Sequence, residues 1–166
     1  MSEPNPYAPP KARVEDPQSS AGDLAGRPER LGAAILDGLI SAIWALPLGY
    51  ALGEFEGFPR VTRLPLPRMA ALALLSFVLF AVVQGYFLKT NGQTIGKKVV
   101  GMRIATLEGG VPPLSRMLGL RYLPFTIAGL IPYVGGLVNL IDVLFIFRAD
   151  RRCLHDHLAG TRVVKA

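Results

Sequence analysis

The stretch Arg30–Leu52, RLGAAILDGLISAIWALPLGYAL, is an apolar run that carries one carboxylate, Asp37. A helix over residues 31–52 rises about 33 Å, which matches a hydrocarbon core of about 30 Å. An ionised aspartate inside such a helix costs about 2.5 to 3.5 kcal/mol to insert, so we expect Asp37 to face a partner or a wet cavity. Arg30 lies two turns earlier on nearly the same helix face. The stretch therefore predicts a transmembrane helix that contains a buried charge.

The composition of the whole chain is typical of a membrane protein. Of the 166 residues, 51% are hydrophobic and 18% are charged, whereas soluble domains average about 25% charged residues. The net charge is +6, and the basic residues flank the apolar segments instead of forming one block. We therefore expect a lipid bilayer with anionic headgroups as a partner, and no nucleic acid.

The hydropathy pattern predicts an all-α membrane protein, a small helical bundle of three to four apolar segments. The third apolar region is too long for one upright span and is broken near Pro132. Its two arms rise about 27 and 21 Å, which leaves open two tilted spans or a re-entrant hairpin. The expected spans are residues 31–52, 69–88, 114–131 and 134–147.

Two further parts of the chain are expected outside the membrane. Residues 1–26 are rich in proline and serine without a periodic apolar face, so they predict a disordered tail. This tail lacks the apolar region of a signal peptide, and the first span is expected to be retained. Short β-branched runs in residues 98–112 and 161–165 predict a small cytoplasmic β element in which the two runs pair. The membrane domain is then residues 27–166.

The distribution of lysine and arginine predicts the orientation. Residues 1–30 contain four, residues 89–116 contain five and residues 148–166 contain five, whereas the first loop with Arg68 contains three. Because basic residues favour the cytoplasmic side, both termini and residues 89–116 are expected in the cytoplasm. The third apolar region then returns to the side from which it started.

With this orientation, polar side chains from several segments fall at one depth beneath the cytoplasmic interface. Two carboxylates, two amides and arginines at one level predict a site for a monovalent cation or a proton. The alternative is a static clasp in which the arginines neutralise the two aspartates and only specify helix packing. The predicted layer comprises Arg30, Asp37, Gln84, Arg121, Asn139 and Asp142.

Small residues in the first span indicate helix association. Ala34, Gly38 and Ala42 repeat at four-residue spacing, which lets another helix approach closely. Because three or four helices leave little room for a conduit, a transport role would require assembly. We therefore expect a homo-oligomer or a membrane partner subunit.

The C-terminal segment holds both histidines, His155 and His157, with Asp156 between them. Residues two apart do not share a helix face, and Cys153 is the single cysteine of the chain, so we expect no metal and no cofactor. Asp156 is expected to anchor the strand-like tail or to pair with a neighbouring arginine. No nucleophile elbow or phosphate loop is present, so no catalytic residue is assigned and an enzyme is not expected.

Four short motifs follow one another along residues 27–165. Each is weakly specific alone, but their order makes the set specific. They are RLGAAILD (Arg30–Asp37), GQTIGK (Gly92–Lys97), the strand-like VGMRI before an acidic-glycine turn, and LHDHLAGTRVV (Leu154–Val164).

Together these motifs resemble the RDD family of bacterial membrane proteins. That family is named for an arginine at the start of its first helix and two aspartates, the first of them within that helix. The resemblance implies that Arg30 and Asp37 are the first two of these residues. Asp142 and Asp156 are alternatives for the second aspartate.

The resemblance also implies a multi-pass protein of the bacterial cytoplasmic (inner) membrane. Transport of unknown ligands is suggested for the family, and cation/proton antiport is attributed to some members. Two hypotheses follow for this chain. One is a transport-related protein whose buried carboxylates bind a cation or a proton; the other is a non-transporting scaffold or accessory subunit whose buried charges serve packing and assembly.

Overall fold

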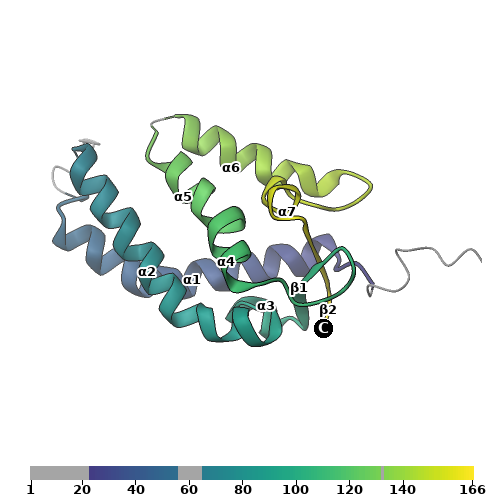
Figure 1. Cartoon of the computed structure of the whole chain (residues 1–166). Coiled ribbons are helices and arrows are strands. Elements are labelled where there is room, and N and C mark those ends of the chain that lie inside the picture. Colours follow the sequence, from purple (N-terminus) through teal and green to yellow (C-terminus); the bar gives the residue numbers. More distant parts are fainter. Residues whose placement is uncertain (1–22, 56–64, 132) are drawn as a thin grey trace, which may run out of the picture.

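The computed structural model describes residues 23–55, 65–131 and 133–166, and these form a mostly helical structure (Figure 1). Helices α1 (Arg27–Ala51) and α2 (Leu66–Asn91) are both long and apolar enough to cross a membrane. They confirm the two long apolar helices that the sequence predicts.

Proline and glycine set the ends of these helices. Pro28 and Pro67 lie in the first turns of α1 and α2, where a missing N–H breaks no intrahelical hydrogen bond. Helix α2 ends at Gly92, whose φ of 66° is left-handed and caps the helix. A Cβ on Gly92 would lie 2.4 Å from the carbonyl oxygen of Ile104. Glycine here both ends the helix and lets the following chain return against it.

The third apolar region forms a helical hairpin of two short arms. The first arm runs without interruption through α4 (Leu114–Arg116), the π-helical turn η2 (Met117–Tyr122) and α5 (Leu123–Gly129). The second arm is α6 (Val134–Leu144) with the 3-10 turn η3 (Phe145–Phe147). Pro124, just after η2, has no N–H to donate, which accounts for the widened turn before it. Helix α6 rises about 16 Å, which is shorter than a hydrocarbon core of about 30 Å. A full crossing of the membrane by the hairpin, and with it a bundle of three or four spans, stays a prediction.

A small antiparallel sheet joins two distant segments. After the short helix α3 (Ile95–Val99), strand β1 (Met102–Thr106) pairs with the C-terminal strand β2 (Thr161–Lys165). Helix α7 (Leu154–Ala159) leads directly into β2. The register runs from Met102 opposite Lys165 to Thr106 opposite Thr161. The predicted pairing between residues 98–112 and 161–165 is therefore confirmed.

Part of the segment that the sequence predicts as a disordered tail lies against the other edge of β2. Residues 1–22 lie outside the described residues, but Leu24 forms a β-bridge with Val164. The backbone N–H of Ala25 donates to the carbonyl of Val163 at 3.1 Å, and Ala25 is buried. Residues 23–26 thus differ from the expected disordered tail, because β2 offers an unpaired edge that an extended segment can satisfy.

The packed core lies at one end of the helices. In Figure 1 the turn between α5 and α6 lies at the left, while α3, β1, β2 and α7 gather at the opposite end of the long helices. On α1 and α2, in contrast, large apolar side chains such as Leu39, Ile43 and Val82 are exposed, which is typical of lipid-facing surface. The buried apolar cluster comprises Ala25, Ala33, Leu88, Met102, Ile104, Met117 and Val163.

The predicted seam of small residues is partly exposed in the described part of the chain. Ala34 and Gly38 are exposed, and a Cβ on Gly38 would meet no atom within 4 Å among the described residues. It is Ala33, one position earlier, that is buried. A helix partner at Ala34, Gly38 and Ala42 stays a prediction.

Candidate functional site

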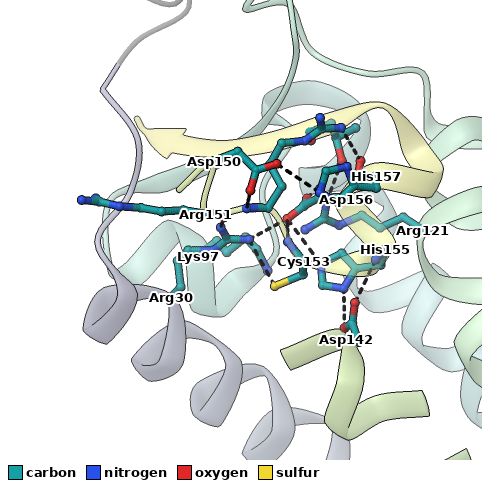
Figure 2. A network of polar contacts seen from close by, with 12 residues as sticks. Arg30, Lys97, Arg121, Asp142, Asp150, Arg151, Cys153, His155, Asp156 and His157 are labelled. Carbon is teal, nitrogen blue, oxygen red and sulfur yellow. Dashed lines mark hydrogen bonds and ion pairs between the residues drawn. The ribbon is translucent and has the colours of Figure 1, made fainter. Parts of the chain in front are cut away.

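Asp156 is the centre of a buried ion-pair cluster (Figure 2). Its Oδ2 lies 2.6 Å from a guanidinium nitrogen of Arg30, at the start of α1. Its Oδ1 accepts a hydrogen bond from Arg121, in the π-helical turn η2. The side chains of Asp156 and Arg121 are 0% and 2% exposed. One carboxylate thus connects α1, the hairpin and α7.

Local structure holds this carboxylate in place. Asp156 lies in the first turn of α7, and its Oδ2 also accepts the backbone N–H of Cys153 at 3.2 Å, which caps that helix. The hydroxyl of Thr161, at the start of β2, donates to Oδ1 at 3.1 Å. Arg152 donates to the backbone carbonyls of Asp156 and Thr161. The expected anchoring of the C-terminal strand by Asp156 is found.

Neighbouring groups affect the pKa of Asp156 more than its burial does. Burial alone would raise the pKa of this carboxyl group, but Arg121, the imidazole of His155 and Arg30, together with the hydrogen bond from Arg121, hold the pKa well below its ordinary value. Asp156 is therefore ionised at neutral pH. It is a fixed negative charge that neutralises buried arginines.

Asp37 belongs to a separate cluster, in which α3 docks against α1. Its Oδ1 accepts the backbone N–H of Gly96 at 2.8 Å and the amide of Gln84 at 3.3 Å. Its Oδ2 accepts the hydroxyl of Thr94, and the ammonium of Lys97 lies 3.7 Å away. Hydrogen bonds therefore engage both oxygens of Asp37.

The sequence GQTIGK explains this docking. Thr94 is the N-cap of α3, and its hydroxyl also accepts the backbone N–H of Lys97. A Cβ on Gly96 would lie 2.4 Å from the carbonyl oxygen of Ala33 and 2.8 Å from the carboxylate carbon of Asp37. Only glycine permits α3 to approach α1 this closely. The GQTIGK motif therefore supplies hydrogen-bond donors that bind the aspartate of the first helix.

Asp142 pairs with a histidine instead of an arginine. Its Oδ1 accepts the backbone N–H of His155 at 2.8 Å, and its Oδ2 lies 2.6 Å from Nδ1 of the same ring. Burial first, and then the charge of Arg121, lowers the pKa of His155, although the carboxylates of Asp142 and Asp156 oppose this shift. The ring is therefore neutral at pH 7 and donates its Nδ1–H to Asp142.

A cavity lies against this pair. It has a volume of about 460 Å³ and is bounded by α1, α2, the first arm of the hairpin, α6 and α7. Its apolar wall is aromatic, and its polar side chains come mainly from the hairpin. The aromatic lining residues are Trp44, Phe77, Phe80, Tyr122 and Phe125, and the polar ones include Arg121, Thr126, Asn139, Asp142 and His155.

The structure divides the predicted polar layer into three groups. Asp37 and Gln84 contact each other at α3, and Arg30 and Arg121 meet at Asp156. Asn139 and Asp142 line the cavity. The arginines therefore do not neutralise Asp37 or Asp142, in contrast to the predicted clasp, because the α7 carboxylate is bonded to both.

Several important contacts could not be assigned from the sequence. Thr94 and Gly96 lie in a motif that the sequence singles out, yet only the fold shows that they bind Asp37. Thr161, the first residue of β2, hydrogen-bonds both Asp156 and Arg121. The available signal for Thr94 was a threonine two residues after a glycine; threonine favours helix N-caps, but the pattern names no distant partner.

Cys153, His155 and Asp156 offer ligand atoms within 4.8 Å of one another. Asp156 already binds two guanidinium groups, so a cation would compete with them for the same oxygens. Burial raises the pKa of the Cys153 thiol to about 11, so the thiolate that a metal requires is disfavoured at neutral pH. The chemistry of this group favours ion pairing over metal binding.

Two apolar helices of membrane-spanning length lead into a polar end held by buried ion pairs, and this arrangement is typical of a membrane-type helical protein. A family model described as the RDD family matches residues 24–160, and the chain belongs to this family. It is 30% identical over 143 residues to an uncharacterized protein of Haemophilus influenzae, covering 85% of this chain and 78% of that protein. It is also 30% identical over 139 residues to the uncharacterized protein YckC of Bacillus subtilis, covering 82% of each. No solved structure matches the chain.

Proposed function

We propose that this RDD family protein is a transport-related membrane protein, not an enzyme, and that its working group is the pair Asp142 and His155. The observation that carries the proposal is the position of this pair beside a cavity between the apolar helices. Asp37 and Asp156, in contrast, bind groups from distant segments and hold the fold together.

The chemistry of the pair suits a proton or a monovalent cation. A neutral imidazole that donates to a carboxylate takes up a proton at its other nitrogen, and Asp142 then neutralises the new charge. The charged groups that act on His155 beside Asp142 are Arg121 from η2 and Asp156 from α7, and Asp156 is itself paired with Arg30 of α1. Nε2 of His155 lies 3.8 Å from Asp156, so a second carboxylate is close to the proton-accepting nitrogen.

Proton flux in liposomes tests this proposal. The full chain is reconstituted with a pH-sensitive dye inside, and a gradient of Na⁺ or K⁺ is applied. We expect Asp142→Asn to abolish cation-linked proton movement per folded protein. The control is Asp37→Asn, which should lower the folded yield but leave the flux of the folded fraction. Full flux in Asp142→Asn would refute the proposal.

One observation favours the alternative of a scaffold or accessory subunit. Ala34 and Gly38 form an exposed small-residue surface on α1, which suits close approach of a second helix. Under this alternative the protein associates through α1 and moves no ion. Cation-linked proton flux of the wild-type protein in liposomes distinguishes the two, because the scaffold moves no ion; association through α1 is tested separately in mild detergent, where Gly38→Leu should reduce the oligomer size.

A further inference from the structure

His155 lies close to two carboxylates, each on a different side of its ring. Its Nδ1 lies 2.6 Å from Asp142, and its Nε2 lies 3.8 Å from Oδ2 of Asp156. The same Oδ2 is 2.6 Å from a guanidinium nitrogen of Arg30 and also accepts the backbone N–H of Cys153. A proton taken up at Nε2 therefore places a second positive charge beside the oxygen that holds Arg30 (Figure 2).

The charges of this cluster balance while His155 is neutral. The two guanidinium groups are matched by the carboxylates of Asp142 and Asp156. Protonation of His155 then leaves the buried cluster with a net positive charge, which is costly unless a cation leaves. The titratable and charged groups that face the ring among the described residues are Arg121 of η2, Asp142 of α6, the neutral thiol of Cys153 and Asp156 of α7, with Arg30 of α1 beyond Asp156.

Arg30 is the cation that can leave. Arg121 lies within the hairpin arm, its side chain is 2% exposed, and it also donates to the hydroxyl of Thr161 at 2.7 Å. Arg30 instead lies at the start of α1, and residues 27–29 beside it are exposed. Its guanidinium group therefore reaches water by a change of side-chain rotamer, whereas that of Arg121 does not.

Arg30 also holds residues 148–153, the segment between η3 and α7 that we call the α7 loop. It donates to the backbone carbonyl of Arg151 and lies 3.7 Å from Sγ of Cys153. Arg151 has a φ of 49°, a left-handed conformation that is strained for a residue with a side chain. Departure of Arg30 removes the contact at this carbonyl, so the strained loop is free to relax.

We infer that a proton on His155 displaces Arg30 from Asp156 and loosens the α7 loop. The polar end of the protein thus changes conformation when the histidine at the cavity is charged. The inference rests on the proposed function, because it adds a conformational response to proton uptake by the same pair. Burial and the charge of Arg121 lower the pKa of His155, so the change is expected below about pH 6.5.

Hydrogen–deuterium exchange of the full protein in mild detergent measures this loosening. Protection factors are compared at about pH 8 and about pH 5, after correction for the intrinsic exchange rate at each pH. We expect protection in the α7 loop to fall about tenfold at the lower pH, while the amides that pair β1 with β2 keep theirs. The reporting amides are those of Arg151, Arg152 and Cys153, which donate to Arg148, Asp150 and Asp156 respectively.

The two histidines of α7 provide a matched pair of variants. His157 lies 3.2 Å from Asp150, away from the Arg30 contact, and both histidines are protonated more fully at the lower pH. His155→Gln has no imidazole to protonate at the cluster, so it should keep its protection on acidification. His157→Gln should lose protection as the wild type does. Thermal melting shows that both variants are folded.

A substitution measured at the higher pH tests the charge balance without acidification. Asp142→Asn removes one negative charge, so the cluster is already positive while His155 is neutral. We expect this variant at the higher pH to show the lowered protection that the wild type shows at the lower pH. Glu29→Gln is the control, because Glu29 is exposed in the first turn of α1 and its charge lies outside the cluster. Its protection should match the wild type.

Three results would overturn the inference. They are unchanged protection of the wild type on acidification, an equal loss in His155→Gln, and wild-type protection in Asp142→Asn at the higher pH. A loss that extends equally to β1 and β2 would also overturn it, because that is global unfolding. Exchange needs no ion gradient, so its failure is separate from that of the proposed function. Lost flux in Asp142→Asn with unchanged exchange refutes only the switch, and the expected exchange in a protein without flux refutes only the proposed function.

Discussion

Removal of the charge on Asp156 should destabilise the protein strongly. Asp156→Asn keeps the size of the side chain but leaves Arg121, whose side chain is 2% exposed, as an uncompensated buried cation. Breaking a buried ion pair by removing one partner costs about 3 to 5 kcal/mol. At about 2 to 4 °C per kcal/mol for a chain of this size, the melting temperature should fall by about 6 to 20 °C.

The assay is thermal melting of the detergent-purified protein, read from the fraction that stays monodisperse after heating. Asp150→Asn is the control, because Asp150 is 36% exposed and lies 3.6 Å from the exposed Arg148. An exposed pair contributes at most about 1 kcal/mol, so this variant should shift by less than about 4 °C. Equal shifts in the two variants would refute the assignment of Asp156 as the structural centre.

Further predictions concern the other groups. Gly96→Ala should displace α3 from Asp37 and cost about 1 to 3 kcal/mol, whereas Gly32→Ala on α1, with no atom within 4 Å of the added Cβ, should not destabilise; equal melting temperatures would contradict this. The lowered pKa of His155 means that the unfolded chain takes up a proton first as pH falls. Stability should therefore decline below about pH 6.5, with a shallower decline in His155→Gln. An unchanged slope in a melting series would contradict the assignment.

The sequence predicts much of the fold because its signals are local. Uninterrupted apolar runs specify α1 and α2, and β-branched residues in the two distant segments specify β1 and β2. Residues 23–26 were predicted as part of a disordered tail, because their extended conformation depends on the free edge of β2 and not on their own composition. The π-helical turn before Pro124 was likewise not predicted, because the sequence shows a proline but not how the helix accommodates it.

The sequence singles out Asp37, Asp142 and Asp156 but not the groups that each of them contacts. Depth along each helix correctly brought Asp37 and Gln84 together. Depth says nothing about rotation around the helix axis, so it could not show that Arg30 and Arg121 both bind Asp156. From the sequence, Asp142 and Asp156 are alternatives for the second family aspartate, and the structure shows an ion pair between Arg30, the arginine of the first motif, and Asp156.

Asp37 and Asp156 hold segments of the fold together, whereas Asp142 is the carboxylate that we propose to work at the cavity. Proton flux per folded protein, compared between Asp142→Asn and Asp37→Asn in the same liposomes, tests this separation most directly. We expect no flux for Asp142→Asn and wild-type flux for the folded fraction of Asp37→Asn. Retained flux in Asp142→Asn with loss in Asp37→Asn would contradict it.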